Sequence, residues 1–143
     1  TEMQAAIGLA QLDKLPKIVE RKQDIFDKYC SELAEFKDSI LPVKPRTDCV
    51  PVYWFTSFLA STPDMRWKLQ VHLEHLRGIQ TRTFFTPLHM QPCYRDGKVV
   101  DARRCSMDVS PALYECGISL PSSYTLSTKE QDFIIDAVKE FFD

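Results

Sequence analysis

The first 38 residues carry apolar side chains at helical spacing. They recur at every third or fourth position, at Ala5, Leu9, Leu12 and Leu15, which is the period of one face of a helix. Thr1 and Gln4 have the spacing of a capping box at the start of this helix. Pro16 lacks a backbone donor and its ring collides with the preceding turn, so the sequence predicts a break or kink there.

A second helix is predicted after Pro16. Its buried stripe is expected at Ile18, Ile25, Tyr29 and Leu33. At 1.5 Å per residue the two helices would together extend over roughly 50 Å. A helical element of this length usually braces something larger than a lone small domain.

Four stretches have the composition of β-strands. Residues 50–60 are nearly all apolar, β-branched or aromatic, which predicts a strand buried on both faces. Shorter strands are predicted over 40–43, 79–85 and 118–120. A long polar loop is expected from 86 to about 106, between the last two of these strands.

Three further helices are interspersed with the strands. Residues 62–77 are predicted as a helix that has Leu69, Leu73 and Leu76 inside and ends at Gly78. A short helix is expected over 110–116. The last helix begins at a second capping box, Ser127 to Glu130, and has its core face at Ile134, Ala137, Val138 and Phe141.

The order of these elements predicts an α+β fold. Long N-terminal helices and further helices would pack on a small, mainly antiparallel sheet, and residues 1–143 would form one domain. Basic and acidic residues number 18 and 20, for a net charge of -2. Because nucleic-acid binding usually shows as a clustered basic excess, no nucleic-acid partner is predicted. Acidic residues dilute the most basic stretch, 95–104, which is interpreted as a solvated loop.

The cysteines indicate neither a disulfide framework nor a zinc knuckle. They number five, at positions 30, 49, 93, 105 and 116, and no Cys-x-x-Cys pair occurs. Reduced thiols are typical of a cytoplasmic protein. No apolar run approaches the roughly 20 residues that span a bilayer, so no membrane partner is predicted.

Two motifs contain a histidine near a second group that could take part in catalysis or metal binding. His72 and His75 flank Glu74, but zinc helices of the protease type place their histidines four residues apart, and here the spacing is three. This run is predicted to be a solvated helix surface without a metal site. Cys93 lies four residues after His89, and a free cysteine is favoured over a papain-like nucleophile.

Polar groups gather where the predicted strand 79–85 ends. They are Arg82, Thr86, His89 and Tyr94. An imidazole can donate to a carboxylate or a phosphate, and the guanidinium of Arg82 would add a forked, permanently charged contact. The structural alternative is that His89 is satisfied within its loop and Arg82 keeps a strand edge soluble. The residues alone leave both interpretations open.

Three segments resemble the DegT/StrS group of nucleotide-sugar aminotransferases. They are TEMQAAIGLAQLDKL at the N-terminus, GIQTRTFFTPLH from Gly78, and SLPSSYTLSTKEQDFIIDAVKEFF from Ser119. The segments fall in the family's order and extend over nearly the whole chain. The first is the most specific, and the other two are informative mainly through their order.

The resemblance implies the C-terminal small domain of a fold-type-I enzyme that uses pyridoxal phosphate. Such enzymes move an amino group from glutamate to a keto group on a nucleotide-linked sugar, and a homodimer is expected. The lysine that binds the cofactor would precede Thr1, so this chain alone is expected to bind no cofactor covalently and to be inactive. By resemblance, His89 is the family's loop histidine near the amino donor or sugar phosphate, and Arg82 and Tyr94 line the same wall.

Two alternatives stay open at this point. A sugar dehydratase of the same family replaces the cofactor lysine by histidine, and that residue would also precede Thr1. A scaffold module without any enzymatic activity would use the long N-terminal helices for dimerisation.

Overall fold

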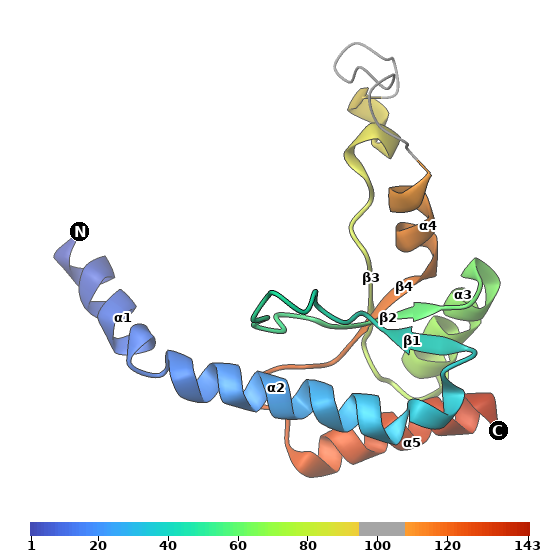
Figure 1. The fold of residues 1–143 in the computed structure, drawn as a ribbon, viewed down its shortest axis with the longest axis horizontal. Coiled ribbons are helices and arrows are strands. Elements are labelled where there is room, and N and C mark those ends of the chain that lie inside the picture. Colours follow the sequence, from blue (N-terminus) through green and yellow to red (C-terminus); the bar gives the residue numbers. More distant parts are fainter. Residues whose placement is uncertain (95–107) are drawn as a thin grey trace.

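The computed structural model describes residues 1–94 and 108–143. Helices pack on one face of a four-stranded antiparallel sheet of strand order β1-β2-β4-β3 (Figure 1). The strands are β1 (Ile40–Pro42), β2 (Thr56–Ala60), β3 (Arg82–Thr83) and β4 (Gly117–Leu120). The predicted α+β class is therefore confirmed. Stretch 95–104, interpreted above as a solvated loop, lies outside the described residues.

The two N-terminal helices, α1 (Glu2–Leu12) and α2 (Leu15–Glu32), are separated by a break. The predicted capping box is present, with Thr1 and Gln4 bonded reciprocally. The helix breaks at residues 13 and 14, just ahead of Pro16, which occupies the first turn of α2. In that turn the missing N–H has no intrahelical partner to lose. Helix α1 points away from the rest of the chain and buries no residue (Figure 1).

The core lies between the sheet and the helices α2 and α5 (Thr128–Phe142). Helix α2 contributes Ile25 and Tyr29, and α5 contributes Ile134, Ala137 and Val138. Leu33, just after α2, is also buried, while Ile18 and Phe141 are half-buried. The inner face of the sheet adds Phe58, Ile118 and Leu120. The predicted stripes of α2 and α5 are thus confirmed, apart from the two half-buried positions.

Helix α3 (Pro63–Val71) continues into a π-helical turn, His72–Leu76. Leu69 and Leu73 are fully buried as predicted, but Leu76 is 72% exposed. The π-turn explains this error, because its i to i+5 bond, from Arg77 N to His72 O at 3.2 Å, rotates the helix face after Leu73. Gly78 ends the helix with a φ of +66°, the left-handed conformation that glycine adopts without strain.

The run from His72 to His75 is less solvated than predicted. His72 Nε2 lies 3.0 Å from Ala137 O. Burial disfavours the charged form of Glu74, but bonds from Thr81 and Gln70 outweigh it and hold the pKa of Glu74 below its usual value. Only His75 is exposed as predicted. The described residues contain no group of three or more His, Cys, Asp or Glu side chains placed to hold a metal ion.

Two strands are shorter than predicted. Of 50–60 only Thr56–Ala60 is a strand, and of 79–85 only Arg82–Thr83. Residues 50–55 lie outside the sheet because the partner strand β4 ends at Leu120, opposite Thr56, and Pro121 has no N–H to extend the ladder. Burial in β2 alternates along the strand, so the expectation of burial on both faces is wrong as well.

The remaining predicted elements are present. Helix α4 (Val109–Cys116) precedes β4, and short 3-10 turns occur at Ala34–Phe36, Leu88–Met90 and Pro92–Tyr94. The Ser127 to Glu130 capping box starts α5. Every helix among the described residues is too short or too polar to span a bilayer.

Candidate functional site

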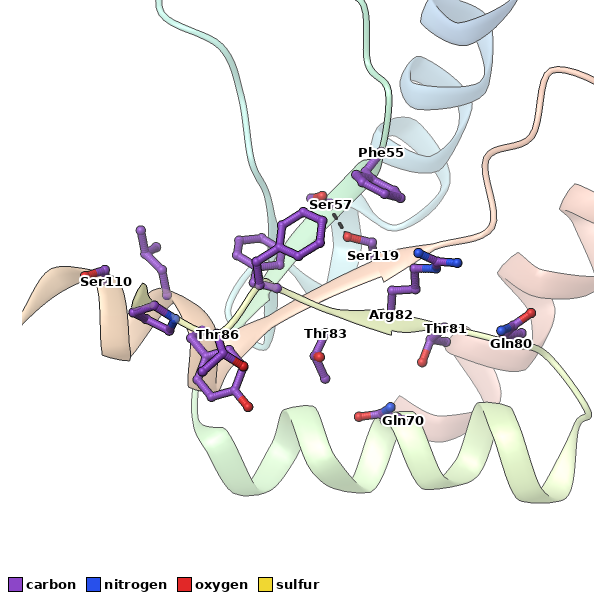
Figure 2. A pocket seen from close by; sticks show the side chains of 15 residues that line it. Phe55, Ser57, Gln70, Gln80, Thr81, Arg82, Thr83, Thr86, Ser110 and Ser119 are labelled. Carbon is purple, nitrogen blue, oxygen red and sulfur yellow. Dashed lines mark hydrogen bonds between the residues drawn. The ribbon is translucent and has the colours of Figure 1, made fainter. Parts of the chain in front are cut away.

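The outer face of the sheet, opposite the core, brings three polar side chains together. Ser119 is the ladder partner of both Ser57 and Arg82. Because side chains alternate along a strand, this face receives Ser57, Ser119 and Arg82, while Phe58 and Ile118 point into the core. Ser57 Oγ and Ser119 Oγ are 2.9 Å apart (Figure 2). Ser119 is buried, whereas Arg82 is exposed.

Two hollows of about 810 and 800 Å³ adjoin at this point. The first extends round the edge strand β3, from Ser57 on the outer face to Gln70 on α3 (Figure 2). The second lies over the N-terminal half of α2. The residues common to both are Phe55, Gln80, Thr81, Arg82 and Ser119. We call the two together the Arg82 trough, and their size is that of small-molecule sites.

The Arg82 trough is positively charged. Its lining residues include Arg82 and Lys22 but no aspartate or glutamate. Within residues 1–94 and 108–143, no carboxylate forms an ion pair with Arg82. A guanidinium without an acidic partner offers a forked set of donors that matches a carboxylate or a phosphate. The charge of the trough therefore favours an anionic ligand.

Exposed aromatic rings border the trough beside Arg82. Trp54 is 71% exposed and Phe85 is 77% exposed. The ring of Phe55 lies between them, with centroids 4.6 Å from Trp54 and 6.4 Å from Phe85. Flat apolar surfaces next to a cation suit a ligand that carries a ring as well as an anionic group.

Lys22 is a trough residue that the sequence analysis missed. It is only 8% exposed, and its Nζ donates to Trp54 O at 2.8 Å, to Ser122 O, and to Ser122 Oγ at 3.3 Å. Burial lowers the pKa of Lys22. The sequence does contain a signal, because Lys22 falls at helical spacing between Ile18 and Ile25 and so lies on the apolar stripe of α2.

The structure does not bring the three predicted site residues into one hollow. Arg82 lines the trough, but His89 and Tyr94 do not. His89 lies in the turn Leu88–Met90 and Tyr94 in the turn Pro92–Tyr94, both half-buried. The segment that carries these turns extends away from the sheet beyond β3 (Figure 1).

The trough does not fit pyridoxal phosphate by itself. The cofactor requires an amine for its aldehyde and a carboxylate for its pyridine nitrogen. Lys22 is the only lysine among the lining residues that the structure describes, and its three N–H groups all have acceptors already. No lining residue supplies the carboxylate. The described residues suit an anionic part of a ligand rather than the cofactor ring.

Three known proteins illustrate what the chain is similar to. It is 32% identical over 143 residues to GDP-perosamine synthase of Escherichia coli O157:H7. The aligned region covers 99% of this chain and 36% of that relative. The structure of S. venezuelae DesV matches with a TM-score of 0.83 at 28% identity, over 98% of this chain and 36% of that one. The PLP-form of the putative sugar aminotransferase Spr1654 from Streptococcus pneumoniae matches with a TM-score of 0.82 at 27% identity. This match covers 99% of this chain and 35% of Spr1654.

These similarities agree in extent. Each covers nearly all of this chain but only about a third of the other protein. The structural matches reproduce the arrangement of helices on a small antiparallel sheet described above. The model of the DegT/DnrJ/EryC1/StrS aminotransferase family matches residues 1–139. The chain therefore belongs to the DegT/DnrJ/EryC1/StrS aminotransferase family.

Proposed function

We propose that residues 1–143 are the small domain of an aminotransferase that uses pyridoxal phosphate and moves an amino group from glutamate to a nucleotide-linked keto-sugar. The family match over residues 1–139 supports this, as does the relative named GDP-perosamine synthase. The rest of the intact enzyme supplies the cofactor and its lysine. The observation that carries the proposal is Arg82, which has no acidic partner among residues 1–94 and 108–143 and lies in a trough whose described lining contains no carboxylate.

In this proposal, the Arg82 trough is part of the active-site wall. The guanidinium of Arg82 holds an anionic group of the substrate, the carboxylate of glutamate or a phosphate of the nucleotide sugar. In the Ser57 and Ser119 pair one hydroxyl donates to the other, so one O–H stays available to the ligand. His89 and Tyr94 complete the wall from the segment beyond β3.

The N-terminal helix is proposed to contact the rest of the intact enzyme, including a second subunit of a homodimer. Its exposed apolar residues support this role: Met3, Ile7, Leu9 and Leu12, followed by Leu15 at the start of α2. The enzyme is proposed to work in the cytoplasm, where cysteines stay reduced. The four described cysteines, Cys30, Cys49, Cys93 and Cys116, are free.

If the rest of the intact enzyme supplies the lysine that binds the cofactor, this chain alone should not bind pyridoxal phosphate covalently. When the 143-residue chain is treated with pyridoxal phosphate and then borohydride, we expect no stoichiometric adduct at any single lysine. The reason is that Lys22, the one lysine in the trough, has its Nζ engaged by three oxygen atoms. Peptide mass spectrometry measures the adducts. One lysine labelled to a full equivalent would contradict the proposal.

Arg82→Gln in the intact enzyme tests the substrate contact. Hydrogen bonds to charged groups contribute about 1.5–3 kcal/mol, so we expect the KM for glutamate or for the sugar substrate to rise about tenfold or more. Cofactor absorbance should stay unchanged. Arg46→Gln is the matched control, because Arg46 is exposed, pairs with Asp48 and lies outside the trough. Equal KM values for Arg82→Gln and the wild type would remove Arg82 from the site.

A further inference from the structure

Side chains of α2 bind the connector between β4 and α5. Tyr29 Oη donates to Pro121 O at 2.9 Å, and Arg21 Nη2 donates to Leu126 O at 2.6 Å. Lys22 Nζ donates to Ser122 O between these two points. Three backbone carbonyls of the connector are therefore satisfied by one helix, and the connector is held along α2.

Of these three side chains, Lys22 also bonds the segment that precedes β2, which forms the wall of the second hollow facing the connector. Its Nζ donates to Trp54 O at 2.8 Å, in the segment that precedes β2. Ser122 Oγ accepts from Lys22 Nζ and, at 3.2 Å, from Thr56 N at the first residue of β2. Trp54 and Ser122 both line the second hollow. A single ammonium group therefore connects the two walls of this hollow and, through Ser122 Oγ, the start of β2.

The segment that Lys22 holds is conformationally strained. Tyr53 has a φ of 42°, a left-handed conformation that is costly for a residue with a bulky side chain. The ring of Phe26 stacks on Tyr53 with centroids 4.0 Å apart. Such a conformation persists only where the surroundings impose it. The stacked ring of Phe26 and the bond from Lys22 to the next carbonyl, that of Trp54, both restrain this segment.

Stability alone does not account for a lysine at this position. Lys22 forms no salt bridge with any carboxylate among the described residues. Burying a charge without a counter-ion costs free energy that an apolar side chain on the same stripe would not. In return, the ammonium provides three directed N–H bonds, which fix positions more narrowly than apolar packing does.

We propose that Lys22 is a positioning residue: it binds no ligand, and it holds Trp54 and Phe55 at the edge of the Arg82 trough in the arrangement that receives the substrate. The hydrogen bonds of Lys22 to Trp54 and Ser122, called the Lys22 bonds below, are a property of this chain. Only their consequence for substrate binding rests on the proposed function. The two are tested by separate measurements below.

Hydrogen exchange on the 143-residue chain tests whether the Lys22 bonds hold the segments on either side of the hollow. Lys22→Met keeps the unbranched apolar stem of the side chain but removes the ammonium group with all three donors. We expect exchange to become about tenfold faster in the peptides covering 53–56 and 121–126, with little change in α5. Lys28→Met is the matched control on the same helix, because among the described residues the ammonium of Lys28 pairs with the exposed Asp132 and with no other carboxylate. Unchanged exchange in both peptides of Lys22→Met would overturn the proposal.

Kinetics of the intact enzyme test the positioning role. For Lys22→Met we expect KM to rise about fivefold to tenfold, with kcat within about twofold of the wild type, because the reacting groups are untouched. A fall in thermal stability without a change in KM would show a purely structural residue and overturn the positioning role. The Arg82→Gln substitution tests the proposed substrate contact separately, because it leaves the bonds of Lys22 in place. If Lys22→Met does not fold, Ser122→Ala removes a single acceptor atom, the Oγ shared by Lys22 Nζ and Thr56 N, and leaves the other two bonds of Lys22 in place. It should raise KM in the same direction, and an unchanged KM there overturns the inference.

Discussion

Phe58→Ala is expected to destabilise the chain by about 3–5 kcal/mol, the usual loss for removing a large aromatic side chain from a core. Phe58 is 1% exposed on β2, a central strand of the sheet. It is the ladder partner of Ile118, and its ring meets Tyr29 edge-on, with centroids 6.5 Å apart. The truncation therefore leaves a cavity between the sheet and α2. Urea denaturation followed by circular dichroism measures the loss.

Phe133→Ala is the matched control for this substitution. Phe133 lies on α5 but is 52% exposed, so we expect a change within about 0.5 kcal/mol. A total stability of about 5–15 kcal/mol is usual for a domain, so Phe58→Ala removes a large part of it. Equal effects of the two substitutions would show that the core does not lie where the structure puts it.

Gly117→Ala is expected to destabilise the chain by about 2–3 kcal/mol, near the upper end of the usual range for overpacking. The backbone conformation is not the reason, because Gly117 has a φ of -78°, which any residue adopts. The added Cβ would collide with the ring of Phe84 and would lie 2.6 Å from Leu113 O. That carbonyl accepts from Gly117 N in the last turn of α4, so it cannot move away without breaking the helix end.

Gly8→Ala provides the contrasting control. A Cβ at Gly8 would meet nothing within 4 Å, and alanine is favoured over glycine in a helix by about 1 kcal/mol. We expect more helical signal and an unchanged urea midpoint, since α1 buries no residue. Phe84 lines the first hollow, so Gly117→Ala should also weaken substrate binding in the intact enzyme. A urea midpoint as unaffected as that of Gly8→Ala would contradict the close packing of Phe84 on β4.

Local signals in the sequence were sufficient for the helix ends. The capping boxes at Thr1 and Ser127 and the stop at Gly78 depend on bonds or backbone angles within about four residues. The stripe of α2 and the core face of α5 followed from helical period alone. The three family segments likewise stand in the sequence itself, and the match over residues 1–139 confirms the resemblance.

Strand lengths depended on partners far away in the chain. Residues 50–55 have strand composition, but β4 ends opposite Thr56 and β1 ends opposite Phe58, so neither neighbouring strand continues alongside them. Leu76 had the correct spacing for burial, yet the π-turn rotated it into solvent. Neither the length of a partner strand nor a change of helix type is encoded in the period of the hydrophobic residues.

The sequence by itself determined the family, the class of fold, the capped helix starts at Thr1 and Ser127, the helix stop at Gly78, and Arg82 as a binding residue to test. Only the tertiary structure decided that Arg82 lies beside Ser57 and Ser119, apart from His89 and Tyr94, and that Lys22 is buried. The physical reason is the separation of the contacts along the chain. The acceptors of Lys22 are 32 and 100 residues away, and folding alone brings them to one nitrogen atom.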